Sequence, residues 1–325
     1  MENRSFEYAI NGDTVIIQKY TGTERRVKIP EIVDGLKVTK IGMRAFYNCT
    51  TIEDVTFPES ITIISVGAFE NCSNLRSVLV SENLTILGDR AFCGCGSLSH
   101  INIPNSLSTI RKQAFAACTS LVSIKLSECL KCIEDYAFAE SGITEIMLPG
   151  DLSCIGTGAF AQCDQLRRFK VDLGNQFYSS LDGVLFNKNQ NALLAFPPAR
   201  SGSYIIPHGV EIIADKAFAR CDLIEEVAIP DSVTNIGMGA FAGCTRLSAI
   251  TLLPGLSRIG AGAFGDCPSL TEITIPESVT NLGRAAFQDC RELKNVVIPN
   301  FTVPDGNLMK FAFEGCTNLK ALSVY

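Results

Sequence analysis

Tryptophan is absent from this sequence of 325 residues, and histidine occurs only twice, at His100 and His208. Neither histidine stands near a Ser/Asp or Cys/Asp arrangement that would suggest nucleophilic catalysis. The zinc-protease motif H-E-x-x-H and the Walker loop are also missing, and we expect no dinucleotide-binding G-x-G-x-x-G after a strand. The sequence therefore predicts that the protein is not an enzyme and uses no cofactor.

An excess of positive charge is missing as well. The 28 basic residues are outnumbered by 34 acidic ones, and a net charge of -6 with a pI near 5.2 argues against a nucleic-acid partner. No stretch approaches the roughly 18 consecutive apolar residues of a membrane-spanning helix, so membrane insertion is not expected. The first residues lack the apolar segment and cleavage site of a signal peptide. If Met1 is the true start, the cytoplasm is the predicted location.

What the sequence does contain is a repeat built around the dipeptide Ala-Phe. Successive repeat phenylalanines are 23 residues apart, except for steps of 22, 58 and 26 residues. The eleven phenylalanines are Phe46, Phe69, Phe92, Phe115, Phe138, Phe160, Phe218, Phe241, Phe264, Phe287 and Phe313. A fixed period of this length indicates one stack of repeated units rather than two separate domains.

Each unit carries the same apolar frame. Ile273 and Ile275 alternate with a polar residue, which predicts a short strand with both apolar side chains on one face. Pro276 ends that strand because proline has no N–H for a ladder. One unit cannot bury its own apolar face, whereas stacked units can. We therefore predict that the phenylalanines, Phe264 among them, form a buried column, and that Gly283 stands where a side chain would obstruct the turn.

The periodicity divides the chain into a cap and a stack. Residues 1–30 predict an N-terminal β cap, because Asn11-Gly12 between two apolar runs is a strong hairpin signal. Residues 31–325 predict a single solenoid of about eleven coils. The long step before Phe218 is expected to carry a hairpin insertion at about residues 172–206, with a polar turn at 187–191 between two apolar runs.

The repeat also resembles a known family. The frame Ile-Pro-x-Ser-Val-Thr-x-Ile-Gly-x-x-Ala-Phe-x-x-Cys-x-x-Leu, nearly complete over residues 230–244, resembles the BspA-like leucine-rich repeats of bacterial surface proteins, and the resemblance covers roughly residues 26–325. It implies a curved, β-rich leucine-rich-repeat solenoid with short parallel strands and an N-terminal β-hairpin cap. It further implies adhesion to a host or matrix protein and a cell-surface or secreted location.

The fourteen cysteines fall mostly into one column. Ten of them stand three residues after the repeat phenylalanine, which predicts buried small hydrophobic residues rather than metal ligands. At Phe138 this position is occupied by Ser141, in a unit that is one residue short. The pair Cys129 and Cys132 forms a lone C-x-x-C, and zinc sites usually need a second pair. Cys132 and Cys154 should be neighbours on adjacent coils, so a disulfide between them is a further alternative.

The candidate binding residues are those that the repeat leaves free. In each strand, the residue between the two apolar positions and the residue two before it should point away from the core. These outward positions are most varied and most charged in the central coils, at His100, Asn102, Lys125, Glu145, Met147, Arg168 and Lys170. We expect a protein or glycan partner to contact them, with Lys125, Arg168 and Lys170 forming a basic patch. The alternative is a solvated face without a partner.

The leading interpretation is thus a non-catalytic, adhesin-like recognition protein that binds a protein or a glycan. The alternative is an intracellular structural or scaffolding repeat protein, which the missing export signal would favour.

Overall fold

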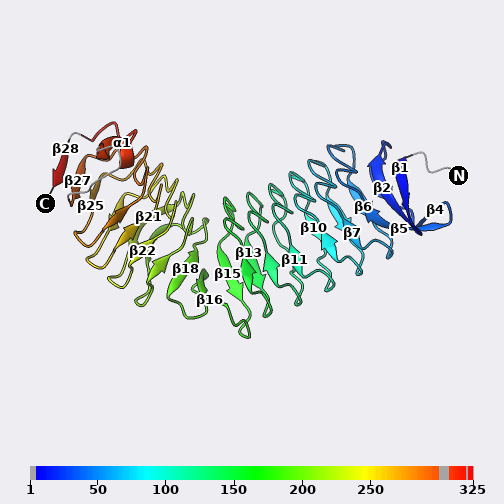
Figure 1. The fold of residues 1–325 in the computed structure, drawn as a ribbon, viewed down its shortest axis with the longest axis horizontal. Helices are drawn as coiled ribbons and strands as arrows, with labels where there is room; N and C mark the ends of the chain where they lie inside the picture. Colours follow the sequence, from blue (N-terminus) through cyan, green and yellow to red (C-terminus); the bar gives the residue numbers. More distant parts are fainter. Residues whose placement is uncertain (1–4, 300–306, 320, 325) are drawn as a thin grey trace. The chain divides into compact units, whose positions relative to one another are not determined.

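The computed structural model describes residues 5–299, 307–319 and 321–324, and the chain forms two compact units. Unit 1 comprises residues 1–163 and 170–177, and unit 2 comprises residues 164–169 and 178–325. Each unit is a β-solenoid in which successive coils place short strands side by side (Figure 1). The leucine-rich-repeat solenoid predicted from the sequence is confirmed, with about 13 turns in place of about eleven.

The N-terminal hairpin cap is also confirmed. Strands β1 (Phe6–Asn11) and β2 (Thr14–Tyr20) pair antiparallel around Gly12 and Asp13, so the turn lies one residue later than expected. Strand β2 then pairs parallel with β5 (Leu36–Ile41), onto which β4 (Ile32–Val33) folds back. The ring of Tyr20 stacks on Phe46 at 5.1 Å. The cap therefore covers the first phenylalanine of the column.

One series of strands follows the alternating apolar pattern of the repeat. In unit 1 it contains β3 (Arg26–Lys28), β6 (Asp54–Thr56), β8 (Ser77–Leu79), β10 (His100–Ile101) and β13 (Glu145–Leu148), and β15 (Arg168–Val171) runs through both units. In unit 2 it contains β19 (Gly202–Ile205), β21 (Ile224–Ala228), β23 (Ala249–Thr251), β25 (Glu272–Thr274), β27 (Asn295–Ile298) and β28 (Ala321–Val324). Neighbouring coils within a unit pair in parallel register, for example Val55 with Val78.

A second series of strands, which no pattern in the sequence predicts, lies just before the Ala-Phe turn. In unit 1 it continues from β5 through β7 (Ile63–Ile64), β9 (Ile86–Leu87), β11 (Thr109–Ile110), β12 (Cys132–Ile133) and β14 (Cys154–Ile155). In unit 2 it contains β18 (Ala192–Ala195), β20 (Ile212–Ile213), β22 (Asn235–Ile236), β24 (Arg258–Ile259) and β26 (Asn281–Leu282). Where both series pair, neighbouring coils are therefore joined through two short strands. The helix α1 (Leu308–Ala312) replaces part of the last Ala-Phe turn.

The predicted phenylalanine column is confirmed in each unit. The eleven repeat phenylalanines are at most 7% exposed. Neighbouring rings stack at centroid distances of 4.6 to 5.7 Å from Phe46 to Phe160 and 4.7 to 5.2 Å from Phe218 to Phe313. Backbone hydrogen bonds also join the Ala-Phe turns of neighbouring coils. For example, the N–H of Phe264 donates to the carbonyl of Ala286 in the next coil at 2.7 Å. The column is the core around which both strand series lie.

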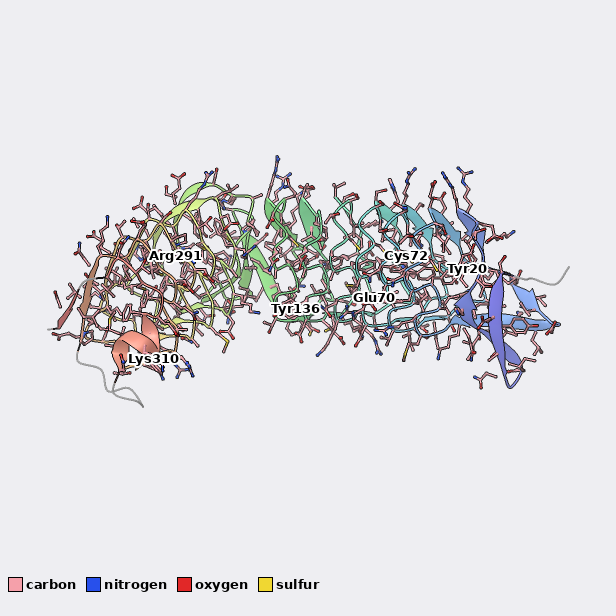
Figure 2. The ribbon with its side chains drawn as sticks, turned by 90° about the horizontal axis from the view of Figure 1, so that it is seen from above. Tyr20, Glu70, Cys72, Tyr136, Arg291 and Lys310 are labelled. Carbon is pink, nitrogen blue, oxygen red and sulfur yellow. The ribbon has the colours of Figure 1, made fainter. Side chains whose placement is uncertain are left out.

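The cysteine column has a reason beyond its size. Nine of its ten cysteines are buried, and the thiol of each of eight of them donates to the carbonyl of a phenylalanine in the coil before it at 3.0 to 3.2 Å. Cys72, inside unit 1 in Figure 2, bonds in this way to Phe46. A thiol is small and apolar enough for the core and still satisfies a buried carbonyl.

The long step in the repeat contains one more phenylalanine of the column. Phe196, preceded by Ala195, is buried and stacks on Phe218 at 4.7 Å. Before it, β16 (Tyr178–Leu181), β17 (Val184–Asn187) and β18 form two successive antiparallel pairings, the first of them around Asp182 and Gly183. Since β18 also pairs parallel with β20, the end of this segment is itself part of a coil.

Among the residues that the structure describes, no helix has the length and apolarity needed to cross a membrane.

Candidate partner-binding face

The first two candidate residues lie on and beside β10, and they differ in role. His100 is exposed, and its Nδ1 lies 2.8 Å from the hydroxyl of Ser99. Asn102 instead extends the backbone ladder, because its Oδ1 accepts from the N–H of Val80 at 3.0 Å and its Nδ2 donates to the carbonyl of the same residue at 3.3 Å. The amide of Asn102 thus links two coils.

A groove marks the place where the first strand series is interrupted. Residues 121–127, between β10 and β13, form no strand, and Lys125 and Met147 from adjacent coils contribute to a groove of about 550 Å³. Met147 is 53% exposed. The complete lining is Lys125, Leu126, Glu128, Cys129, Met147, Pro149, Gly150, Asp151 and Asp172. An exposed apolar side chain thus lies in a groove with one cation and three carboxylates.

Two other candidates neutralise each other. The Nζ of Lys170 lies 2.9 Å from Oε1 of Glu145, and both side chains are 41% exposed. Such a half-exposed pair contributes about 1 kcal/mol or less to stability. With Glu145 beside it, Lys170 is not an isolated positive charge.

Arg168 belongs to unit 2, whereas the other six candidates belong to unit 1. Its side chain is exposed and packs beside the turn of the β16–β17 hairpin, where a Cβ added to Gly183 would lie 2.7 Å from Cβ of Arg168. The structure therefore groups Lys125 with Met147 and Glu145 with Lys170. It places carboxylates beside both of these lysines.

The acidic residues of the groove were missed by sequence reasoning. Glu128 and Asp151 lie in turns and Asp172 directly follows β15, all outside the outward strand positions that predicted the face. A usable signal was present, because the turn Pro149-Gly150-Asp151 directly follows a strand with the outward Met147.

The cysteines outside the column are free thiols, as are all fourteen. Cys132 and Cys154 are direct partners on β12 and β14, as the spacing predicted. Burial, together with the neighbouring Cys154, raises the pKa of the Cys132 thiol to about 12. Over the described ranges, no group of three or more His, Cys, Asp or Glu side chains is arranged to hold a metal ion.

Cysteine labelling should separate the column from the surface. Under native conditions at pH 8, iodoacetamide should modify the exposed Cys129 and Cys154 first. Cys267 should stay unmodified because burial raises its pKa to about 12 and excludes the reagent. Mass spectrometry of the peptides measures this order, and denaturation of a separate, unlabelled sample should expose fourteen reactive thiols. Equal rates at Cys267 and Cys129 would contradict the buried column, and a lower total would indicate a disulfide.

One expectation about motifs was wrong. The sequence Gly260-x-Gly262-x-x-Gly265 follows β24 and has the spacing of a dinucleotide-binding loop. Here, however, the glycines belong to the Ala-Phe turn of the repeat. The turn places Phe264 in the core and leads into a further turn instead of the helix that would bind a pyrophosphate. The match is therefore a product of the repeat.

Comparison with known proteins establishes the family. A family model described as BspA type leucine rich repeat region (6 copies) matches residues 36–173 and 211–325. This chain belongs to the BspA-type leucine-rich-repeat family. A leucine rich cell surface protein from Faecalibacterium prausnitzii is 31% identical to this BspA-type chain, with a TM-score of 0.79 over 100% of this chain and 94% of that one. A search of curated proteins finds no match.

Two more distant structures share the BspA-type fold. The pneumococcal vaccine antigen PcpA is 23% identical, with a TM-score of 0.81 over 100% of this chain and 87% of that one. A leucine-rich repeat protein from Eubacterium ventriosum is 20% identical, with a TM-score of 0.75 over 97% of this chain and 84% of that one. At these identities the likeness concerns the fold.

Proposed function

We propose that this BspA-type chain is a non-catalytic, adhesin-like recognition protein that binds its partner through the groove at Lys125 and Met147. The groove is the observation that carries the proposal, because it lies on the extended strand face that repeat proteins commonly use for binding. The proposed location is the cell surface. It is supported by the description of the Faecalibacterium relative as a leucine rich cell surface protein.

The chemistry of the groove favours a protein partner with a basic group. Met147 and Pro149 offer apolar contact at the groove, while three carboxylates outnumber Lys125. An apolar contact surrounded by charged groups is the usual arrangement of a specific interface. The partner that fits places an apolar side chain against Met147 and a lysine or arginine near Asp151. This differs from the acidic partner that a patch of three cations would select.

Charge and shape variants of the groove test the proposal. We expect Met147→Asp and Asp151→Lys each to weaken binding at least about tenfold, which corresponds to 1.4 kcal/mol. The measurement is surface plasmon resonance against purified matrix and plasma proteins, with a glycan array in parallel for the glycan alternative. Leu79→Asp is the control, because Leu79 lies on β8 in the same strand series, is 61% exposed and is outside the groove.

The outcomes are distinct. Loss of binding in both groove variants, with Leu79→Asp unchanged, supports recognition by the groove. Equal binding by all three variants would show that the partner contacts another face. Binding to the glycan array alone would replace the protein partner with a carbohydrate.

A further inference from the structure

A second groove crosses the N-terminal coils of unit 1, on the second strand series. It has a volume of about 680 Å³, and we call it the axial groove. One side is formed by the outward residues of β2, β5, β7 and β9, which are direct partners on successive strands: Ile16, Lys40, Ile63 and Ile86. Met43 and Val66, which follow the strands, also line it. The groove therefore extends from coil to coil, across the strands.

Apolar residues gather in this groove although the repeat does not require them. Met43 is 68% exposed, Val66 40% and Ile86 37%. The equivalent strand positions of other coils carry Thr109, Cys132, Asn235, Arg258 and Asn281. The repeat frame thus accepts polar residues at these positions, so the core does not explain the apolar ones. A cluster of exposed apolar side chains commonly marks a binding site.

At two positions the lining of the axial groove is bare backbone. Gly42 and Gly88 have no side chains because adjacent coils approach too closely for one. A Cβ on Gly88 would lie 2.5 Å from the backbone nitrogen of Val66, and a Cβ on Gly42 would lie 2.7 Å from the carbonyl oxygen of Ile17. The close stacking of coils therefore creates the depth of the groove.

The N–H groups of Gly42, Ser65 and Gly88 are already engaged in hydrogen bonds between coils. The three N–H groups donate to carbonyls one coil earlier, Gly42 to Ile17 at 2.7 Å, Ser65 to Ile41 at 3.0 Å and Gly88 to Ile64 at 2.8 Å. The carbonyls of the same three glycine and serine residues each accept from an alanine three residues later. A peptide laid in the groove would find no backbone donor at these three residues for its own carbonyls, which cost free energy when left unpaired. An alkyl chain has no such groups.

Two cations line the axial groove. Arg111 follows its strand directly, at the position that glycine occupies in Gly88, and its exposed side chain lines the groove. Lys40 lies on the strand side. Within the described part of the chain, neither forms an ion pair with a carboxylate, whereas the nearby Lys112 pairs with Asp135 at 3.3 Å. No acidic residue is among the lining residues.

We propose that the axial groove binds a long-chain carboxylate, with its alkyl chain along Ile63, Val66 and Ile86 and its carboxylate at Arg111. The apolar residues exclude water from the chain, and the guanidinium can hold a carboxylate with two parallel hydrogen bonds. With strands about 4.8 Å apart, the four steps from β2 to β11 span roughly 19 Å, enough for an extended alkyl chain. This ligand site is separate from the proposed partner-binding groove and does not depend on it.

Titration calorimetry of the full chain with monomeric dodecanoate, below its micelle concentration, tests the site. We expect dodecanoate to bind one-to-one. Octanoate should bind at least about tenfold more weakly, because its shorter chain buries fewer methylenes. Arg111→Gln should weaken dodecanoate binding at least about tenfold, and Val66→Asp should abolish it. Both side chains are exposed, so their thermal midpoints should stay close to that of the parent chain, which calorimetry verifies. Arg258→Gln, the same change at a strand position in unit 2, is the matched control and should bind dodecanoate unchanged.

Other ligands distinguish the alternatives. Dodecyltrimethylammonium, with the same chain and a positive head group, should bind at least about tenfold more weakly than dodecanoate. Equal binding of the two amphiphiles, or dodecanoate binding that ignores Arg111→Gln, would overturn the assignment of the carboxylate to Arg111. Absence of heat with dodecanoate would overturn the site itself. So would binding to phosphatidylglycerol vesicles without binding to the monomer, since that result would indicate a membrane surface.

Discussion

Replacing Phe264 with alanine is expected to lower the free energy of unfolding by about 3–5 kcal/mol, the usual cost of truncating a buried phenylalanine. Phe264 is fully buried and stacks on Phe241 and Phe287, each at 5.1 Å. The truncation removes both ring contacts and leaves a cavity in the middle of unit 2. The adjacent coils cannot close it easily, because the strand pairings of β24 with β22 and β26, and of β25 with β27, hold them at a fixed spacing.

Reversible denaturation measures the loss, and hydrogen exchange over residues 259–290 shows whether the coils beside the cavity open first. Phe177→Ala provides the control, because Phe177 is 51% exposed and lies outside the column. It should cost about 1 kcal/mol or less. A similarly small loss for Phe264→Ala would mean that the column does not hold the coils together.

Replacing Asn175 with alanine should destabilise unit 1 by about 2–4 kcal/mol, since buried polar groups left without partners cost about 1–3 kcal/mol each. Asn175 is fully buried, and its Nδ2 donates to the carbonyls of Pro149 and Leu152 at 2.8 and 2.9 Å. Its Oδ1 also accepts from the N–H of Phe177 at 2.8 Å. The single side chain thus satisfies backbone groups in two coils.

The matched control for this variant is Asn83→Ala. The Nδ2 of Asn83 also donates to a backbone carbonyl one coil earlier, that of Glu59 at 3.0 Å, but at an exposed position where water can replace it. Its loss should cost about 1 kcal/mol or less. Thermal and chemical unfolding of both variants decide the matter. Equal losses of stability in the two variants would show that burial does not increase the contribution of the Asn175 amide to the free energy of unfolding.

The parts of the fold that could be predicted are those with a periodic signal. Alternation in segments such as Ile273-Thr274-Ile275 predicts the first strand series, and the spacing of Ala-Phe and cysteine predicts the two buried columns. The second series consists mostly of two-residue strands such as Ile63–Ile64, which are too short for any alternation. Its pairing is fixed by the stacking of coils, which no local pattern encodes. The left-handed backbone at Arg44 and Tyr136 is equally hidden, because neither is glycine.

The candidate face was predictable only in part. Lys125 and Met147 follow from the outward strand positions, and both line the groove. The bond from Asn102 to Val80 and the ion pair of Glu145 with Lys170 join residues 22 and 25 positions apart. Side chains at such separations meet only because coils stack, so charge counted along the sequence overstates the positive character of the face.

The phenylalanine column also shows that the number of residues between two rings is free to vary. Phe313 follows Phe287 after 26 residues, part of them in a helix, and still stacks at 5.2 Å. Phe196 ends a segment with two antiparallel pairings and still stacks on Phe218. The family model leaves residues 174–210 unmatched, although they contain this ring. A new loop can therefore be inserted into a coil without altering the core, and such loops are natural sites for engineering new binding surfaces on this scaffold.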